Sequence, residues 1–371
     1  MSKTLQDYAT LINDTIQSNE INHYITTDNM CQNLGGIDTF KNINIPQGKV
    51  RSFQKDDVLL SNIRLYFRKV YRAKQKGGCS SDVLVFRAKH IDSATLFAIL
   101  SSQIFTDYAC SGSQGSKMPR GNKTHMMDFK IPTINFTIAK IFNSIQNKIE
   151  NNHKINELLH KILELLYEQY FVRFDFLDEN NKPYQTSGGK MKFSKELNRL
   201  IPNDFEVKTL GELTQLKVGN KNANHSSNQG KYPFFTCSNN PLRCETYQFE
   251  GKHIIISGNG NFYVTHYDGK FDAYQRTYVV NPNNPNHYVL IYLFVKSYTN
   301  YLKLQSRGSI IKFITKSDIE NIKIVLPNLK TYAKWNNALK MIENNNQSTQ
   351  TLTALRDFLL PLLLKQQVKP Q

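Results

Sequence analysis

The sequence predicts an α+β fold in which two similar β-rich domains are each followed by one long helix. Motifs in the first half of the chain return in the second half in the same order, which indicates an internal repeat. Two long segments carry apolar residues at helical spacing. With 371 residues the chain is also too long for one ordinary domain. We expect the two helices to pack against each other as an antiparallel coiled coil.

The repeat rests on four motifs with nearly constant offsets. An apolar strand entering a turn, a Gly-Ser pair, an apolar strand ending in proline and a helical Ile-Glu-Asn-Asn motif follow one another in both halves. The offset is 193 residues from Gly115 to Gly308 and 193 residues from Glu150 to Glu343. The motifs occupy residues 58–62, 115–118, 129–132 and 149–152, and then residues 254–258, 308–311, 324–327 and 342–345.

The first long helix is predicted at about residues 134–170 and the second at about residues 332–365. In the first, apolar residues alternate in steps of three and four with Asn152 in the seam, a pattern typical of coiled coils. Two amphipathic helices that merely cover a core would show a similar stripe, and that alternative stays open. The apolar positions are Ile138, Ile141, Ile145, Ile149, Ile155, Leu159, Ile162 and Leu166, and then Ala338, Met341, Ile342, Leu352, Leu355, Phe358, Leu359 and Leu362.

These signals give the predicted domain boundaries. The first β-rich domain spans residues 1–132, the first helix 133–170, a turn-rich connector 171–204, the second β-rich domain 205–328, and the second helix with its tail 329–371. The first domain starts with residues 5–8 (LQDY) where the second copy has residues 210–213 (LGEL), which suggests a slight truncation of the first. Asp82 and Asp272 occupy similar places in the two copies and are candidate structural caps.

The composition predicts a globular protein of a reducing compartment. Hydrophobic residues make up 40% and charged residues 21%, and no apolar run reaches the roughly 18 residues of a membrane span. The first residues lack a signal-peptide pattern, so a cytoplasmic location and no membrane association are expected. The five cysteines are scattered, which argues against a disulfide framework; they are Cys31, Cys79, Cys110, Cys237 and Cys244.

The charge balance favours a polyanionic partner. The chain carries 47 Lys and Arg residues against 30 Asp and Glu residues, a formal net charge of +17. Such an excess attracts nucleic acid through steering and counterion release. A Lys- and Asn-rich composition inherited from an AT-rich genome would give the same excess, so charge alone does not decide the partner.

The sequence contains no recognisable catalytic, cofactor or metal motif. There is no Pro-Pro pair for a base-flipping methyltransferase loop and no phosphate-binding G-x-x-x-x-G-K-[ST]. The turn at residues 258–261 (GNGN) lacks the third glycine of a dinucleotide loop. Cys237, Cys244, His253 and His266 form no closely spaced pair of the kind that structural zinc sites use. We therefore predict no catalytic residue and no bound metal.

Several segments together resemble the target-recognition domains of specificity subunits from bacterial type I restriction-modification enzymes. Residues 171–174, 184–190 and 355–361 also resemble that family's junction and terminus. The resemblance covers nearly the whole chain. The segments are residues 232–238 (YPFFTCS), 254–261 (IIISGNGN), 269–277 (GKFDAYQRT) and 308–313 (GSIIKF), with residues 24–30 (YITTDNM), 58–64 (VLLSNIR), 79–86 (CSSDVLVF) and 117–121 (KMPRG) in the first half.

The resemblance implies a non-catalytic DNA-recognition subunit of a bacterial defence system. Each domain would recognise one half of a bipartite site in double-stranded DNA, and the helices would set the gap between the halves. The implied partners are modification (methyltransferase) subunits, two in number, and restriction (translocase and nuclease) subunits. S-adenosylmethionine, ATP and Mg²⁺ would be bound by those partners and not by this chain.

Polar and basic residues on turns are the candidate DNA-binding residues, because Arg pairs with guanine and Asn or Gln with adenine. Phosphate contacts or turn stabilisation are the alternatives for each of them. The candidates are Asn62, Arg64, Arg68, Lys117, Arg120, Asn259, Asn261, Tyr274, Gln275, Arg276 and Lys312. The candidate partner-binding residues of the helices are Ile138, Ile145, Leu159, Leu166, Met341, Leu355 and Leu359.

Three other functions stay open at this point. The chain could be a recognition module of another restriction-modification type, since the same domains would serve it. It could be a coiled-coil adaptor that binds only proteins. It could also be a stand-alone methyltransferase or nuclease with an unfamiliar site, although the missing motifs argue against that.

Overall fold

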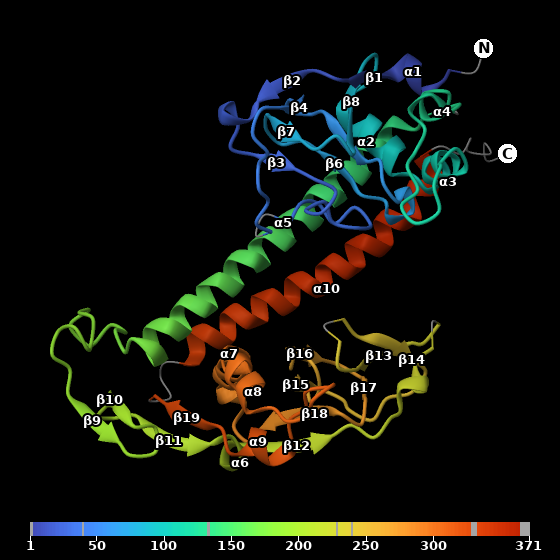
Figure 1. Cartoon of the computed structure of the whole chain (residues 1–371). Coiled ribbons are helices and arrows are strands. Elements are labelled where there is room, and N and C mark those ends of the chain that lie inside the picture. The colour runs from blue at the N-terminus through green and yellow to red at the C-terminus, as the bar shows by residue number, and fades with distance from the viewer. Residues whose placement is uncertain are drawn as a thin grey trace. The chain divides into compact units, whose positions relative to one another are not determined.

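A computed structural model of the chain describes residues 3–38, 41–131, 134–227, 229–238, 240–327 and 332–363 (Figure 1). The chain divides into two compact units, of which unit 1 comprises residues 1–155 and 344–371 and unit 2 residues 156–343. Each unit therefore combines one β-rich region with part of both long helices. The predicted boundaries at residues 132–133 and 328–329 and the tail beyond Leu363 lie outside the described residues.

Two four-stranded sheets form the described β-rich region of unit 1, in the strand orders β1-β8-β5-β6 and β2-β4-β7-β3. The central strands β5 and β8 are runs of buried apolar residues whose side chains alternate between two cores. Leu60 joins the core beneath the helices, whereas Leu59 joins the core that contains the second sheet. The strands are β1 (Ala9–Ile12), β2 (Thr15–Gln17), β3 (Tyr24–Ile25), β4 (Lys49–Phe53), β5 (Val58–Ser61), β6 (Val70–Arg72), β7 (Gly77–Cys79) and β8 (Val83–Ala88).

Short helices with side-chain caps complete unit 1. The side chains of Asp92, Ser102 and Asn122 each accept a hydrogen bond from the backbone N–H three residues later, which fixes where three of these helices begin. The helices are α1 (Leu5–Tyr8), α2 (Ser93–Ser101), α3 (Gln103–Ser111) and α4 (Lys123–Met127), with short 3₁₀ turns η1 (Ser18–Glu20) and η2 (Leu65–Phe67).

Unit 2 repeats this plan. Its four-stranded sheet has the order β12-β18-β15-β16, and β13 lies between β14 and β17 in a second sheet. The strands are β12 (Thr214–Val218), β13 (Tyr232–Phe235), β14 (Leu242–Cys244), β15 (Lys252–Ser257), β16 (Val264–Asp268), β17 (Asp272–Ala273) and β18 (Thr277–Pro282). The helices are α6 (Leu210–Leu213), α7 (Tyr288–Ser297), α8 (Thr299–Gln305) and α9 (Lys316–Glu320), with 3₁₀ turns η4 (Ala223–His225) and η5 (Pro285–His287).

The predicted internal repeat is confirmed element by element. The two main sheets have equivalent strand orders, and α1 and α6 are both four-residue helices that begin with a capping box. The Leu5 N–H donates to the Phe129 carbonyl at 2.8 Å, and the Leu210 N–H donates to the Ile322 carbonyl at 2.7 Å. The predicted match of residues 5–8 with residues 210–213 is therefore correct. The expected truncation of the first domain stays a prediction.

The segment predicted as a connector, residues 171–204, folds into unit 2. It forms the hairpin β9 (Met191–Ser194) and β10 (Arg199–Pro202), next in the chain to β11 (Glu206–Thr209), which pairs with β19 (Lys323–Leu326). Phe171, Phe174 and Ile201 are buried in the unit's main core. The sequence did not predict this packing, because the apolar residues of the segment are separated by polar turns and follow no helical or strand spacing.

The long helices are α5 (Phe136–Tyr167), continued by one π-helical turn η3 (Glu168–Val172), and α10 (Tyr332–Leu363). They lie side by side and run antiparallel, as predicted (Figure 1). In unit 1 the Asn152 side chain donates to the Asn345 carbonyl and to Thr349 Oγ1. In unit 2 the Asn156 side chain donates to the Ile342 carbonyl. Asn152 lies in the seam, as the sequence predicted.

The predicted apolar stripe of α5 was partly wrong. Ile141, Ile155 and Ile162 are exposed. From Ile138 to Asn156 one row of buried positions instead repeats in steps of four and three, and the buried face includes polar residues that a hydropathy pattern passes over. The buried positions of α5 are Ile138, Ala139, Phe142, Ile145, Gln146, Ile149, Asn152, Asn156 and Leu163.

The stripe predicted for α10 contains the same error. Met341, Leu355, Phe358 and Leu362 are exposed. The buried positions include a charged residue, Arg356, which explains why the apolar pattern alone chose a neighbouring face. The buried positions are Tyr332, Trp335, Leu339, Ile342, Arg356, Leu360 and Leu363.

Asn152 is expected to fix the helix register at a cost in stability. Its Oδ1 atom is buried and has no hydrogen-bond partner among the described residues. Replacing Asn152 with Leu removes this unpaired oxygen, so Asn152→Leu should raise the free energy of unfolding by about 1 kcal/mol. Denaturant unfolding measures the change, and Asn151→Leu on the exposed face serves as the matched control. A lower stability for Asn152→Leu alone would contradict this role.

Candidate nucleic-acid interface

Three segments of unit 1 meet at the end of β5 and bring most of its predicted DNA-binding residues together. The Asn62 N–H donates to the Asp82 carbonyl at 2.8 Å, and the Arg64 N–H donates to the Pro119 carbonyl at 2.9 Å. Residues 114–120 form a hairpin whose ends, Gln114 and Arg120, exchange backbone hydrogen bonds. We call Asn62, Arg64, Lys117 and Arg120 the first turn cluster.

The side chains of this cluster differ in their exposure and in their contacts with the rest of unit 1. Lys117 is exposed. Arg120 forms an ion pair with Asp82 at 2.9 Å but remains largely exposed. Arg64 has a left-handed backbone, and its guanidinium donates to the Lys117 carbonyl at 3.3 Å. Asn62 Oδ1 and Arg64 Nε are buried and have no hydrogen-bond partner among the described residues.

Arg68 does not belong to this cluster. Its guanidinium donates to the Ser101 carbonyl at 2.9 Å, at the end of α2. Burial lowers the pKa of the Arg68 guanidinium. The side chain therefore supports the fold around η2, and the prediction that it contacts DNA receives no support from its position.

Unit 2 assembles the equivalent segments. The Gly258 N–H donates to the Arg276 carbonyl at 2.7 Å, and the Gly260 N–H donates to the Lys312 carbonyl at 2.9 Å. Residues 307–313 form a hairpin whose ends, Arg307 and Phe313, exchange backbone hydrogen bonds. These bonds unite the remaining predicted residues in the second turn cluster, which comprises Asn259, Asn261, Tyr274, Gln275, Arg276 and Lys312.

Most side chains of the second turn cluster reach solvent. Gln275, Arg276 and Lys312 are exposed, and Tyr274 is half-buried. The Thr277 N–H donates to the Tyr274 carbonyl at 2.8 Å, which closes the turn that carries Gln275 and Arg276. Asn261 is exposed and its amide contacts Tyr263 Oη at 3.0 Å.

The shared hydrogen-bond pattern aligns the two clusters residue by residue. Asn62 matches Gly258, because the N–H of each donates to the carbonyl of the residue just before a strand of the main sheet. That residue is Asp82, before β8, in unit 1 and Arg276, before β18, in unit 2. Asp82 therefore matches Arg276, and the prediction that Asp82 matches Asp272 is wrong. Asp272 pairs in register with Phe234 as Gly78 pairs with Tyr24, so its counterpart is Gly78. The same backbone frame thus carries different side chains in the two units.

The hairpin tips expose apolar side chains that the sequence reading missed. Met118 in unit 1 and Ile310 and Ile311 in unit 2 are exposed, Ile310 by 94%. Gly115 and Gly308 begin the two hairpins with the same positive φ of 99°, a conformation that favours glycine. The Gly-Ser repeat was the available signal for these tips.

The predicted partner-binding residues of the helices fall into three groups. Ile138 and Ile145 are buried in unit 1, so neither offers a surface to a partner, which corrects that prediction. Leu159, Leu166 and Leu359 pack at the edges of the cores. Met341 and Leu355 are exposed. Further exposed apolar residues of α5 and α10 are Phe136, Ile141, Ile155, Leu158, Ile162, Leu165, Phe358 and Leu362.

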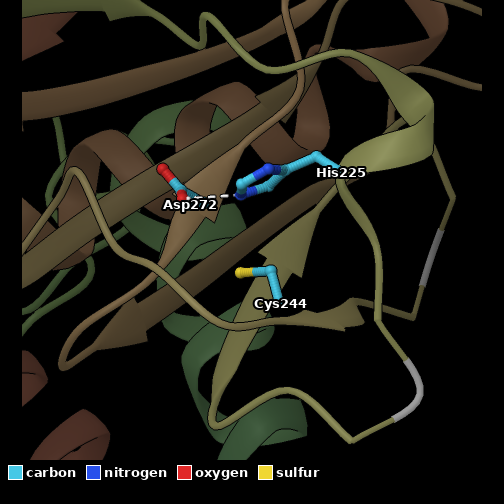
Figure 2. A group of neighbouring side chains, drawn as sticks. All are labelled: His225, Cys244 and Asp272. Atoms are coloured by element: carbon cyan, nitrogen blue, oxygen red, sulfur yellow. Dashed lines mark hydrogen bonds and ion pairs between the residues drawn. The ribbon is translucent and has the colours of Figure 1, made fainter.

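Unit 2 also contains a group of potential metal ligands that the sequence did not single out. His225, Cys244 and Asp272 come from three separate elements and lie together (Figure 2). The other residues considered for zinc contact different partners: Cys237 lies beside the Arg276 carbonyl, His253 beside Phe271 and His266 beside Glu343. None of the five cysteines forms a disulfide. Among the described helices, none has the length and hydropathy that crossing a bilayer requires.

Comparison with known proteins supports the predicted resemblance. Residues 202–355 match the family model described as the type I restriction modification DNA specificity domain. The specificity subunit of the type I restriction enzyme EcoDI from Escherichia coli is 38% identical over 132 residues, which cover 34% of this chain and 28% of that subunit. Residues 202–355 therefore carry this DNA specificity domain, and the chain is similar to type I restriction-modification specificity subunits.

Two further specificity subunits extend the likeness beyond the matched domain. The specificity subunit of the type I restriction enzyme MjaIX from Methanocaldococcus jannaschii is 24% identical over 301 residues, covering 72% of this chain and 67% of that subunit. The crystal structure of the type I restriction-modification S subunit from M. genitalium shares the fold, with a TM-score of 0.63 and 16% identity over 99% of this chain and 96% of that one. Both halves of the chain thus follow the specificity-subunit fold.

Proposed function

We propose that this specificity subunit recognises a bipartite DNA sequence, one half with each turn cluster, and catalyses no reaction itself. The observation that carries the proposal is the repeated backbone frame of the clusters, which presents different side chains in units 1 and 2. Equivalent frames with different side chains suit two independent readers of an asymmetric site. The net charge of +17 supplies the sequence-independent attraction to phosphate.

Direct base contacts would come from the exposed polar members of the clusters. Lys117 and Arg120 in unit 1, and Gln275, Arg276 and Lys312 in unit 2, present donors to the major-groove edges of bases. The exposed apolar tips at Met118 and Ile310 provide the kind of surface that contacts thymine methyl groups. Arg68 is left out of this proposal because its guanidinium is bound within the fold.

Partner subunits would supply the chemistry. We expect two modification (methyltransferase) subunits to bind the exposed apolar residues of α5 and α10, with restriction (translocase and nuclease) subunits joining them. S-adenosylmethionine would be bound by the modification subunits, and ATP and Mg²⁺ by the restriction subunits. A cytoplasmic location of the complex is expected, where DNA is available.

The test lengthens both helices by one heptad. Duplicating residues 152–158 of α5 and residues 340–346 of α10 preserves the seven-residue seam and the polar contacts on either side. Seven residues add about 10 Å of helix, which corresponds to about three base pairs. Mapping methylated adenines after co-expression with the modification subunits should show unchanged half-sites separated by a longer gap.

An insertion of equal length in the exposed turn at residues 178–181 is the matched control and should leave the methylated motif unchanged. A continuous motif that is indifferent to helix length would contradict the two-reader proposal. Methylation that never depends on this chain would favour a coiled-coil adaptor, and turnover by the purified chain alone would favour an enzyme.

A further inference from the structure

His225, Cys244 and Asp272 converge at the second sheet of unit 2, and none of them is a member of the second turn cluster. One ligand atom from each lies within 4.8 Å of the others. His225 Nε2 is 3.0 Å from Asp272 Oδ2, and Thr246 Oγ1 is 2.7 Å from the same oxygen and 3.2 Å from His225 Nε2. Figure 2 shows the His225 imidazole beside the Asp272 carboxylate and the Cys244 thiol next to them.

Burial of the Asp272 carboxylate costs free energy unless a cation or hydrogen-bond donors satisfy both of its oxygens. Asp272 and Cys244 are both 0% exposed. Asp272 Oδ2 accepts the hydrogen bonds from His225 and Thr246, but Oδ1 is buried and has no hydrogen-bond partner among the described residues. A fully buried carboxylate is normally paired through both oxygens or coordinates a metal. The unpaired Oδ1 atom thus points to a missing ligand, in addition to the closeness of the three side chains.

We propose that His225, Cys244 and Asp272 bind one Zn²⁺ ion that stabilises unit 2. Zinc prefers the nitrogen, thiolate and carboxylate ligands that these side chains provide, and a tetrahedral site with bonds of about 2.0–2.3 Å places ligands about 3.3–3.8 Å apart. His225 Nε2 and Asp272 Oδ2 lie 3.0 Å apart, and no pair of ligand atoms is more than 4.8 Å apart, so side-chain movements of the order of 1 Å would complete the site. Thr246 Oγ1 contacts both Asp272 Oδ2 and His225 Nε2, and it or a water molecule would be the fourth ligand.

The three ligands connect elements that no single hairpin holds together. His225 ends η4, Cys244 ends β14, and Asp272 begins β17. Asp272 is two residues before Tyr274, the first residue of the turn at residues 274–277. An ion at this place would therefore fix the strands that support the turn carrying Gln275 and Arg276.

The repeat provides an internal comparison. Gly78 occupies the position in unit 1 that Asp272 occupies in unit 2. Glycine has no ligand atom, so the equivalent place in unit 1 lacks the carboxylate. The proposal therefore predicts one zinc ion per chain and not two.

The test measures metal content in the full-length chain, purified without a metal-binding tag and dialysed to remove loose ions. Elemental analysis should find about one zinc per chain. After replacement by Co²⁺, absorption should show the bands of a tetrahedral ion together with a thiolate-to-cobalt charge-transfer band. Cys244→Ser should abolish the charge-transfer band, and Asp272→Asn and His225→Gln should lower the bound metal at least tenfold.

Cys237→Ser is the matched control, because Cys237 is a half-buried thiol of the same unit that lies beside the Arg276 carbonyl. It should retain both the zinc and the charge-transfer band. A wild-type chain that holds no zinc and binds no Co²⁺ would overturn the proposal, as would full metal content in all three ligand variants. The wild-type measurement needs no variant to fold and no DNA, so its outcome is independent of the proposed DNA recognition.

Discussion

Replacing Arg356 with Ala should destabilise unit 1 by about 3 kcal/mol, the largest stability effect that we expect from any single substitution in α10. Arg356 is only 2% exposed although it carries a guanidinium. Its Nη1 donates to the Asn33 carbonyl at 3.3 Å and to Gln146 Oε1 at 3.2 Å. Its Nη2 forms an ion pair with Asp357 at 3.0 Å.

The size of the effect follows from what Arg356 connects. Gln146 of α5 in turn donates to the Leu34 carbonyl at 2.6 Å, so both long helices bind the same turn of unit 1. Asn33 and Leu34 have positive φ angles, a conformation that residues other than glycine adopt only when contacts hold it. Loss of the guanidinium leaves a cavity and two unpaired oxygens beside this turn.

The loss in the free energy of unfolding is measured by denaturant titration, with hydrogen exchange of the unit 1 amides as the detection method. Arg356→Met, which keeps much of the volume, should lose about half as much. Phe358→Ala on the same helix is the matched control, because its side chain is 68% exposed, and it should change stability by less than about 0.5 kcal/mol. Equal losses in Phe358→Ala and Arg356→Ala would show that α10 responds to truncation in general and not to the buried guanidinium.

Arg356 also shows where sequence reasoning about the fold stops. The repeat at a constant offset predicted two equivalent units, and the three- and four-residue spacing predicted the antiparallel helices. The same reasoning placed Leu355 in the seam because leucine is apolar, whereas the buried residue is its neighbour Arg356. A hydropathy pattern assigns a charge to solvent, and only the carbonyl and amide partners contributed by distant residues make its burial acceptable.

The candidate interface was predictable in its location more than in its detail. Turn residues that follow apolar strands and contain Asn, Arg and Gly identified both clusters, because strand ends gather at one edge of a sheet. The sequence did not reveal that Arg68 serves the fold, since its partner Ser101 lies 33 residues further along the chain. The sequence named Cys244 and Asp272 separately but did not group them with His225, because the spacing of 19 and 28 residues between the three matches no short ligand motif.

Arg276 should be the residue of unit 2 whose loss most changes DNA recognition. It is exposed at the closed turn of residues 274–277, and none of the ion pairs among the described residues includes it. Its backbone carbonyl, not its side chain, binds Gly258, so Arg276→Ala removes the guanidinium and leaves the turn intact. If Arg276 contacts guanine, DNA affinity should fall about 5- to 150-fold, equivalent to about 1–3 kcal/mol.

The pattern of the loss distinguishes the two possible contacts. A base contact predicts that one position in one half-site becomes degenerate in the methylated motif, while the other half-site is unchanged. A phosphate contact predicts weaker binding to all sequences and a reduced dependence of affinity on salt, with an unchanged motif. Binding titrations at several salt concentrations, together with methylation mapping, separate these results.

Lys192→Ala is the matched control for the removed charge. Lys192 is exposed on β9 of the same unit, and Figure 1 shows the β9–β10 hairpin on the opposite side of unit 2 from β13 and β14. Its loss should leave the motif and most of the affinity unchanged, because a remote cation contributes only to the general field. Equal effects of Arg276→Ala and Lys192→Ala would mean that the Arg276 guanidinium attracts DNA only through its charge. In that case the turn at residues 274–277 would not be part of the surface that reads the sequence, and the exposed hairpin at residues 307–313 would become the remaining candidate in this unit.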